Sequence, residues 1–203
     1  MLFRSKKVIV FAIIVSSAAC SSTQKKVLVY AKGTATVNEA TKTITASDGA
    51  GSDEKTLLLS DKEKVTINIE TTNGKAAIDI PENGYYIVNA KQDTIVGSYQ
   101  KYGEAKTTKA VMTQALLKQS IDSLQQIIQG KNISAANRNF FILPMTAVKV
   151  TTNMDAFIVG PFHQMTSIEK VEDKEPEVYR FYSVKEVRET IKKLTELTIG
   201  EKK

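Results

Sequence analysis

The sequence predicts an α+β fold: an antiparallel β-meander or small sandwich-like sheet in the N-terminal half, with two amphipathic helices packed on it. Three observations support this expectation. Apolar and polar residues alternate on both sides of an Asn-Gly pair over residues 65–80. The apolar spacing changes to the helical period over residues 107–129, and it does so again over residues 183–199. Helices with one apolar face need a partner surface, which a sheet can provide.

The strongest β-signal is a hairpin around Asn73-Gly74. Val65, Ile67 and Ile69 alternate with polar residues before this pair, and a second alternating run follows it. Asn-Gly between two such runs favours a tight two-residue turn, because both residues tolerate a positive φ. Further strands are expected at residues 27–30, 33–37, 43–46, 57–59, 85–90, 94–99, 140–150, 156–159 and 178–182.

The first helix has one apolar stripe. Its residues recur at intervals of four, three and four: Leu117, Ile121, Leu124 and Ile128. Thr107 or Thr108 can serve as the N-cap, because a hydroxyl oxygen there accepts a hydrogen bond from a free backbone N–H. Gly130 is placed to end the helix, since glycine readily adopts the left-handed conformation that follows many helices.

The second helix has a start signal as well as an apolar stripe. Ser183-Val184-Lys185-Glu186 matches a capping box, in which the serine hydroxyl and the glutamate carboxylate each accept a hydrogen bond from the other residue's backbone N–H. The stripe recurs at intervals of three, four and three: Val184, Val187, Ile191 and Leu194. Gly200 marks the expected end of this helix.

The first twenty residues have the layout of a secretory signal peptide. Residues 1–7 carry three basic side chains, residues 8–15 are all apolar, residues 16–19 are small, and Cys20 follows at once. As a helix, eight apolar residues cover about 12 Å, whereas a bilayer core is about 30 Å thick. The segment is therefore too short for a permanent membrane span.

The end of this leader carries a specific motif. Ser17-Ala18-Ala19-Cys20 resembles the lipobox of bacterial lipoproteins, with serine at the position where leucine is commoner. The resemblance covers only the leader. It implies that the Cys20 thiol receives a diacylglycerol, that the chain is cut before Cys20, and that the new amine is acylated. Two or three acyl chains then anchor the protein stably to a membrane.

The motif also fixes the expected organisation of the chain. Residues 1–19 are the lipoprotein signal peptide, residues 20–26 are a lipidated tether, and residues 27–203 form a single α+β domain. The protein is then lipid-anchored in the cell envelope. Ser21 after the cysteine resembles lipoproteins released to the outer membrane, which implies an outer-membrane position facing the periplasm.

The charge pattern argues against a nucleic-acid partner. The formal net charge of +6 comes from 28 basic and 22 acidic side chains, and three of the basic ones lie in residues 1–19. After cleavage, 25 basic side chains remain against 22 acidic ones. Charges of both signs alternate, as in residues 61–64 and 169–174, which is typical of a solvated surface and not of a basic stripe.

Side chains that carry catalysis or hold zinc are scarce. Cys20 is the only cysteine and His163 is the only histidine. A zinc site needs several such ligands, and nucleophilic catalysis needs an activated nucleophile with a base, so we expect no catalytic site, no metal and no cofactor. His163 follows Gly160-Pro161 and is interpreted as a loop histidine.

Two further site hypotheses are weighed against simpler structural interpretations. Residues 48–54 offer three carboxylates in a Gly- and Asp-rich loop, but without EF-hand spacing, so a plain turn is favoured over a weak calcium site. A sugar platform could use tyrosines in the absence of tryptophan, although packing across the sheet is favoured. Those tyrosines are Tyr85, Tyr86, Tyr99 and Tyr102.

These observations lead to an expected function class. We expect a non-enzymatic envelope lipoprotein with a binding or structural role, held to the membrane by lipid on Cys20 and contacting an envelope protein. The alternative is a lipoprotein hydrolase or sugar-binding module, and a third is an outer-membrane assembly factor. An exposed aromatic cleft favours the alternative, whereas an apolar surface patch favours a protein partner.

Overall fold

Two long paired strands form the first part of the fold. The computed structural model describes residues 24–61, 63–100, 113–134, 136–164 and 175–200. Strands β1 (Lys25–Asn38) and β2 (Thr43–Leu59) are antiparallel. Their register breaks at Gly33, which stands opposite residues 48–51. Gly33 has φ +72°, and an added Cβ would overlap the Ser47 carbonyl oxygen, so only glycine fits this bulge.

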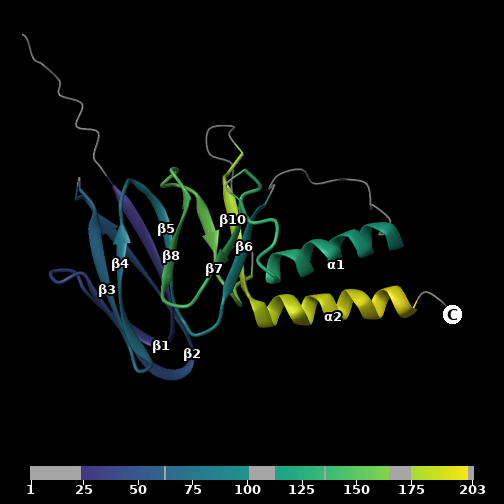
Figure 1. Ribbon diagram of the computed structural model, residues 1–203, viewed down its shortest axis with the longest axis horizontal. Coiled ribbons are helices and arrows are strands. Elements are labelled where there is room, and N and C mark those ends of the chain that lie inside the picture. Colours follow the sequence, from purple (N-terminus) through teal and green to yellow (C-terminus); the bar gives the residue numbers. More distant parts are fainter. Residues whose placement is uncertain (1–23, 62, 101–112, 135, 165–174, 201–203) are drawn as a thin grey trace, which may run out of the picture.

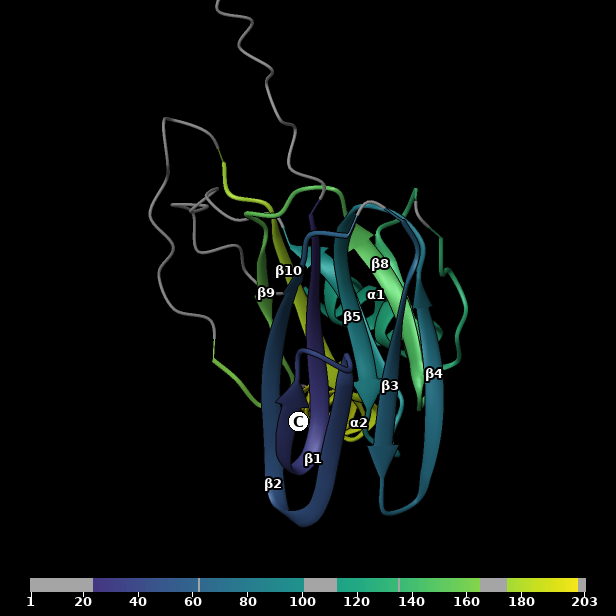
Figure 2. The same cartoon turned by 90° about the vertical axis from the view of Figure 1, so that its left-hand side faces the viewer.

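The bulge bends the β1–β2 hairpin, and the ribbon turns back on itself there (Figure 2). Four more strands complete this sheet: β3 (Val65–Thr71), β4 (Gly74–Ile80), β5 (Gly84–Ala90) and β8 (Thr146–Thr151). The strand order is β4-β3-β2-β1-β5-β8, and the edge strands β4 and β8 lie close together. The sheet therefore curls around its own apolar face.

The predicted antiparallel meander is only partly correct. The β3–β4 and β5–β8 pairs are antiparallel, but β1 pairs in parallel with β5, and β2 pairs in parallel with β3. In both parallel pairs, one half of the bent hairpin pairs with a strand outside it: the first half of β1 with β5 and the first half of β2 with β3. The coarser expectation, an α+β fold with a large sheet in the N-terminal half, is confirmed.

A second, smaller sheet covers the other face of β1 and β5. Its strands are β6 (Ile95–Gln100), β7 (Asn139–Ile142), β9 (Phe157–Val159) and β10 (Val178–Ser183), in the order β7-β6-β10-β9. Alternate residues of β1 enter different cores: Val27 and Val29 face the inside of the curled sheet, whereas Leu28 and Tyr30 face the small sheet. β1 and β5 are thus a shared wall between two cores, which explains why every residue of β5 is buried.

The predicted β3–β4 hairpin is present, with its turn one residue earlier than expected. Thr71 pairs with Gly74, so Thr72 and Asn73 form the two-residue loop. Gly74 is the first residue of β4 and has φ +154°. The alternation of Val65 and its successors placed the strands correctly, because their apolar side chains all enter the inner core.

The helices α1 (Gln114–Ile128) and α2 (Val184–Gly200) do not pack on the sheet as predicted. They lie side by side and extend away from the strands (Figure 1). Gly130, just after α1, lies against the Phe141 ring of β7, and the Val184 N–H donates to the Thr94 carbonyl at the start of α2. The end of α1 and the start of α2 therefore meet the body, so the helices are antiparallel.

The two apolar stripes face one another, and both faces of the β1–β5 wall are already covered by other strands. One face of the β1–β5 wall is covered by the curled sheet and the other by the small sheet. Within the parts of the helices whose side chains are described, only Leu117 and Val187 are fully buried. The helices thus form an arm whose stripes are half-buried against each other.

The helix caps follow local sequence rules. Ser183 Oγ accepts from the Glu186 N–H at 3.1 Å, and Glu186 Oε2 accepts from the Ser183 N–H at 2.7 Å, which confirms the predicted capping box. Thr113 is the N-cap of α1, with its hydroxyl accepting from the Leu116 N–H. The caps proposed at Thr107 and Thr108 lie outside the described residues.

Candidate functional site

Three loops gather at the end of the body opposite to the start of β1. β5 is parallel to β1, so the turn after β5, residues 91–94, lies at that far end. Residues 143–145 join it there, because β8 starts beside the end of β5. Residues 160–163 follow β9, which runs in the same direction as β10 towards the start of α2. Loops held by rigid strands are where binding residues most often lie.

The loop 160–163 is fixed by polar contacts at both ends. The Phe162 N–H donates to Glu186 Oε1 at 2.7 Å, so the capping-box carboxylate also holds this loop. The Arg180 guanidinium donates to the His163 carbonyl at 3.1 Å. Pro161 is buried, yet the Phe162 side chain is 60% exposed with a backbone φ of +64°. The loop therefore presents an aromatic ring to solvent from a conformation that non-glycine residues rarely adopt.

His163 is paired with a carboxylate from a distant strand. Its Nδ1 lies 3.2 Å from Glu54 Oε1 and 3.0 Å from the Pro161 carbonyl oxygen. Both neighbours are hydrogen-bond acceptors, so Nδ1 is the ring nitrogen that donates in this arrangement. The histidine interpreted as a simple loop residue and one carboxylate of residues 48–54 thus form one carboxylate–imidazole pair.

A buried tyrosine lies beside this pair. Tyr30 is 1% exposed, and among the described residues its hydroxyl has no hydrogen-bond partner. An added Cβ at Gly160 would lie 2.9 Å from that hydroxyl and would overlap Glu54 Oε1, so glycine is needed for the loop to approach. An unpaired buried hydroxyl costs stability, which makes Tyr30 an unusual choice for a purely structural position.

Burial and charge set the protonation of the cluster. Burial raises the pKa of Glu54, and the charges of His163 and Lys91 partly offset that rise. Burial also raises the pKa of Tyr30, and the Glu54 charge adds to the rise. The Tyr85 phenol, on the next strand, has its pKa raised to about 12, mainly by burial. The buried Lys91 places its ammonium 5.5 Å from the centre of the Phe162 ring.

Two hollows open at the same end of the body. One, of about 250 Å³, is lined by polar residues that include Lys32, Asp48 and Gln92 and by the apolar Ala46 and Ala90. The other is a groove of about 590 Å³ between the turn 92–94 and α2. Gln92 lines both. Hollows with an apolar base and a few polar groups are the usual form of binding sites.

The predicted loop over residues 48–54 is part of strand β2, and its carboxylates point to different partners. Asp48 accepts from the Thr72 hydroxyl, and Asp53 accepts from the Ala35 N–H. That hydrogen bond, followed by Lys55, lowers the pKa of Asp53. Within the described ranges, no three histidine, cysteine, aspartate or glutamate side chains gather as a metal site.

The tyrosines do not form an exposed platform among the described residues. Tyr85 and Tyr86 are buried in the two cores. Tyr99 lies under the Arg138 guanidinium, whose carbon is 3.8 Å from the ring centre. Tyr102, like the lipidation residue Cys20, lies outside the described residues.

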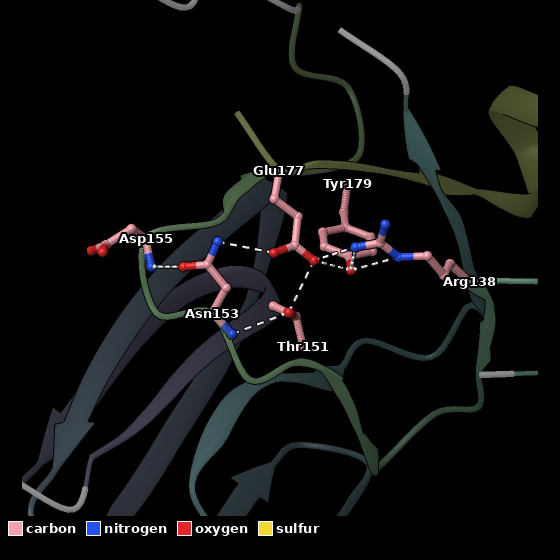
Figure 3. Close-up of polar contacts among 6 residues, drawn as sticks. All are labelled: Arg138, Thr151, Asn153, Asp155, Glu177 and Tyr179. Atoms are coloured by element: carbon pink, nitrogen blue, oxygen red, sulfur yellow. Dashed lines mark hydrogen bonds and ion pairs between the residues drawn. The ribbon is translucent and has the colours of Figure 1, made fainter. Parts of the chain in front are cut away.

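The polar network around Glu177 was not foreseen from the sequence. Figure 3 shows its carboxylate receiving hydrogen bonds from Tyr179, Arg138 and Thr151 on one oxygen and from Asn153 on the other. Burial raises the pKa of Glu177, but these hydrogen bonds and the Arg138 charge outweigh it and hold the pKa below its ordinary value.

Both oxygens of the Glu177 carboxylate accept hydrogen bonds within this network, so its role is to join structural elements. Thr151 belongs to the large sheet, and Tyr179 belongs to the small one. The network therefore ties the two sheets together at the end where β1 begins. Its members come from three separate segments of the chain, so no local pattern predicts them.

Comparison with models of protein families, with characterised proteins and with solved structures finds no match for this chain in any of the three. Among the helices of the described part of the chain, none is long and apolar enough to cross a membrane.

Proposed function

We propose that this chain is a lipid-anchored protein of the bacterial cell envelope that binds an envelope protein through its loop-bearing end. The anchor is the Cys20 thiol, inferred from the lipobox-like Ser17–Cys20 sequence, and the proposed location is the outer membrane facing the periplasm. The body carries the binding role and performs no catalysis.

The exposed ring of Phe162 is the observation that carries the binding role. Its loop is held by hydrogen bonds to the Glu186 carboxylate and from Arg180 to a backbone carbonyl, so the ring is presented without a large loss of conformational freedom on binding. Leu143, 52% exposed, lies in the loop of residues 143–145 at the same end of the body. Aromatic residues on a rigid base are the usual anchors of protein interfaces.

Site-specific crosslinking in cells tests this role. A photo-crosslinking residue at Leu143 should give a discrete adduct with one envelope protein, and Phe162→Ser in the same chain should abolish that adduct. The matched control places the crosslinker at Asn83, an exposed turn residue at the opposite end. An adduct that survives Phe162→Ser, or that forms equally from Asn83, would contradict the proposed binding end.

The anchor has its own test. Mass spectrometry of the mature protein should show diacylglycerol on the Cys20 thiol, and Cys20→Ala should leave the chain uncleaved or soluble, because no other residue can take the lipid. An unmodified Cys20 thiol in the wild-type protein would rule out the anchor.

The Glu54–His163 pair favours the alternative, a lipoprotein hydrolase, because a carboxylate at Nδ1 is how proteins orient a catalytic imidazole. No serine or threonine hydroxyl is hydrogen-bonded to His163 among the described residues, so the binding role is preferred. We expect His163→Ala to leave the cellular function intact and purified residues 21–203 to bind no zinc. Loss of function in a folded His163→Ala protein would make the hydrolase the better proposal.

A further inference from the structure

Leu58 breaks the polarity pattern of the curled sheet. Its neighbours Leu57 and Leu59 are buried in the inner core, so strand alternation places residue 58 outside. At all other exposed positions of β1, β2, β3 and β4, the residue is polar or small. Leu58, with 73% of its surface exposed, is the exception. A single exposed leucine is common on protein surfaces, so what it contacts must be argued from its position in the fold.

Leu58 lies where the tether enters the body. It is the register partner of Lys26 on β1. The start of β1 is firmly held, because the buried Lys25 ammonium donates to the Asp61 and Glu63 carbonyl oxygens. The Lys26 ammonium donates to the Met154 carbonyl oxygen at 3.0 Å. The tether therefore leaves from a fixed point directly beside the exposed leucine.

The length of the tether places this point close to the membrane. Five residues of chain lead from Cys20 to Lys25. Even fully extended they span no more than about 18 Å. With lipid on Cys20, the end of the body that carries Leu58 is therefore confined to the membrane surface, whatever path the tether takes.

We propose that this end rests on the bilayer, with the Leu58 side chain inserted between the lipid headgroups and acyl chains. The inference rests on the lipid anchor of the proposed function. A bilayer is a better occupant than a protein, because a stable protein interface buries about 800 Å² on each partner, far more than one leucine offers. The acyl chains on Cys20 supply the membrane affinity, and Leu58 fixes the orientation.

The absence of tryptophan makes the orientation measurable. The chain has no tryptophan, so Leu58→Trp introduces a single fluorescent reporter at an exposed position. The full lipidated chain would be placed in phosphatidylethanolamine–phosphatidylglycerol vesicles with brominated acyl chains, which quench tryptophan on contact. Thr56→Trp is the matched control on the same face of β2, about 7 Å further from the tether. Leu143→Trp reports on the opposite end.

We expect brominated chains to remove most of the Leu58→Trp emission, less of the Thr56→Trp emission and none of the Leu143→Trp emission. Should Leu58→Trp fail to fold, cysteine with a nitroxide label at the same positions gives the same comparison, because the sole native cysteine is blocked by lipid. Lipid on Cys20 without quenching at position 58, or with equal quenching at 58 and 143, overturns the orientation alone. A chain without lipid on Cys20 overturns the anchor and the orientation together.

Discussion

Glu177→Gln tests how much the buried polar network contributes to stability. The substitution keeps the shape of the side chain but removes its charge. Glu177 Oε1 accepts from Tyr179, Arg138 and Thr151, and Oε2 accepts from Asn153. Glutamine retains one carbonyl acceptor but replaces the other carboxylate oxygen with an NH₂ donor. In one orientation of the amide this donor faces the Asn153 side-chain N–H, and in the other it faces the Arg138 guanidinium, so two donors meet in either case.

The expected loss follows from these contacts. Hydrogen bonds to a charged group contribute about 1.5–3 kcal/mol each, against about 1 kcal/mol for neutral ones. The Arg138 side chain is 37% exposed, so solvent screens part of the attraction to Glu177. Together these considerations give a loss of about 2 kcal/mol in the free energy of unfolding. For a domain of this size, that lowers Tm by about 4–8 °C.

The penalty should depend on pH, because the network lowers the pKa of Glu177 in the folded state. A lowered carboxyl pKa stabilises the fold above the unfolded-state pKa of about 4.3, and that contribution is lost as the pH falls through the folded value. The difference in stability between the wild type and Glu177→Gln should therefore be full at neutral pH and shrink below about pH 4.

Urea or thermal unfolding followed by circular dichroism measures this difference in stability at pH 7 and at pH 3. Glu175→Gln is the matched control, because Glu175 is an exposed carboxylate two residues away. The control should leave Tm nearly unchanged. The account of the network is wrong if Glu177→Gln behaves like the control at neutral pH, or if its penalty is as large at pH 3 as at pH 7.

Three further substitutions separate local structure from the candidate site. Gly74→Val should destabilise the fold by about 1–3 kcal/mol, since a β-branched residue is forced to φ +154°; an unchanged Tm would contradict this. Ser183→Ala should cost about 1 kcal/mol through the lost cap of α2, measured by urea unfolding. Tyr30→Phe should raise the free energy of unfolding by about 1 kcal/mol, because it removes a buried hydroxyl that has no partner in the described part of the chain. If the same variant also loses the crosslinked adduct, Tyr30 belongs to the binding site; if stability falls, its hydroxyl has an unseen structural role.

Features that depend on neighbouring residues were predictable from the sequence. The strands around Asn73-Gly74 follow from alternation, and the start of α2 follows from the Ser183–Glu186 capping box. In both cases the stabilising contacts lie within a few residues of each other. The turn itself was misplaced by one residue, because the apolar pattern fixes which face a side chain occupies and not which residue forms the loop.

Features that depend on distant pairing were not predictable. The bend at Gly33 turns four expected short strands into two long ones, and nothing in the local alternation signals a fold-back of the hairpin. The helices were expected on the sheet because their stripes needed a partner. That prediction failed because the second sheet, built from short strands late in the chain, covers the face they would have used.

The candidate site was missed for the same reason. His163 and Glu54 were each recognised as notable residues, but a sequence without known contacts gives no reason to pair them. Tyr30 was not considered at all, because it lies in an ordinary apolar strand. The signal that marks it, a buried hydroxyl without a partner among the described residues, exists only in three dimensions.

The proposed membrane contact and the candidate site are coupled through the same two strands. Lys26 pairs with Leu58, and four residues further along the ladder Tyr30 pairs with Glu54. Four residues of strand span about 13 Å. A bilayer's headgroup region adds about 5–8 Å beyond the acyl core on each side. With Leu58 at that boundary and the ladder upright on the membrane, the Glu54–His163 pair lies beyond the headgroups. Because a β-ladder is stiff, the distance between Leu58 and the Glu54–His163 pair does not depend on the tether.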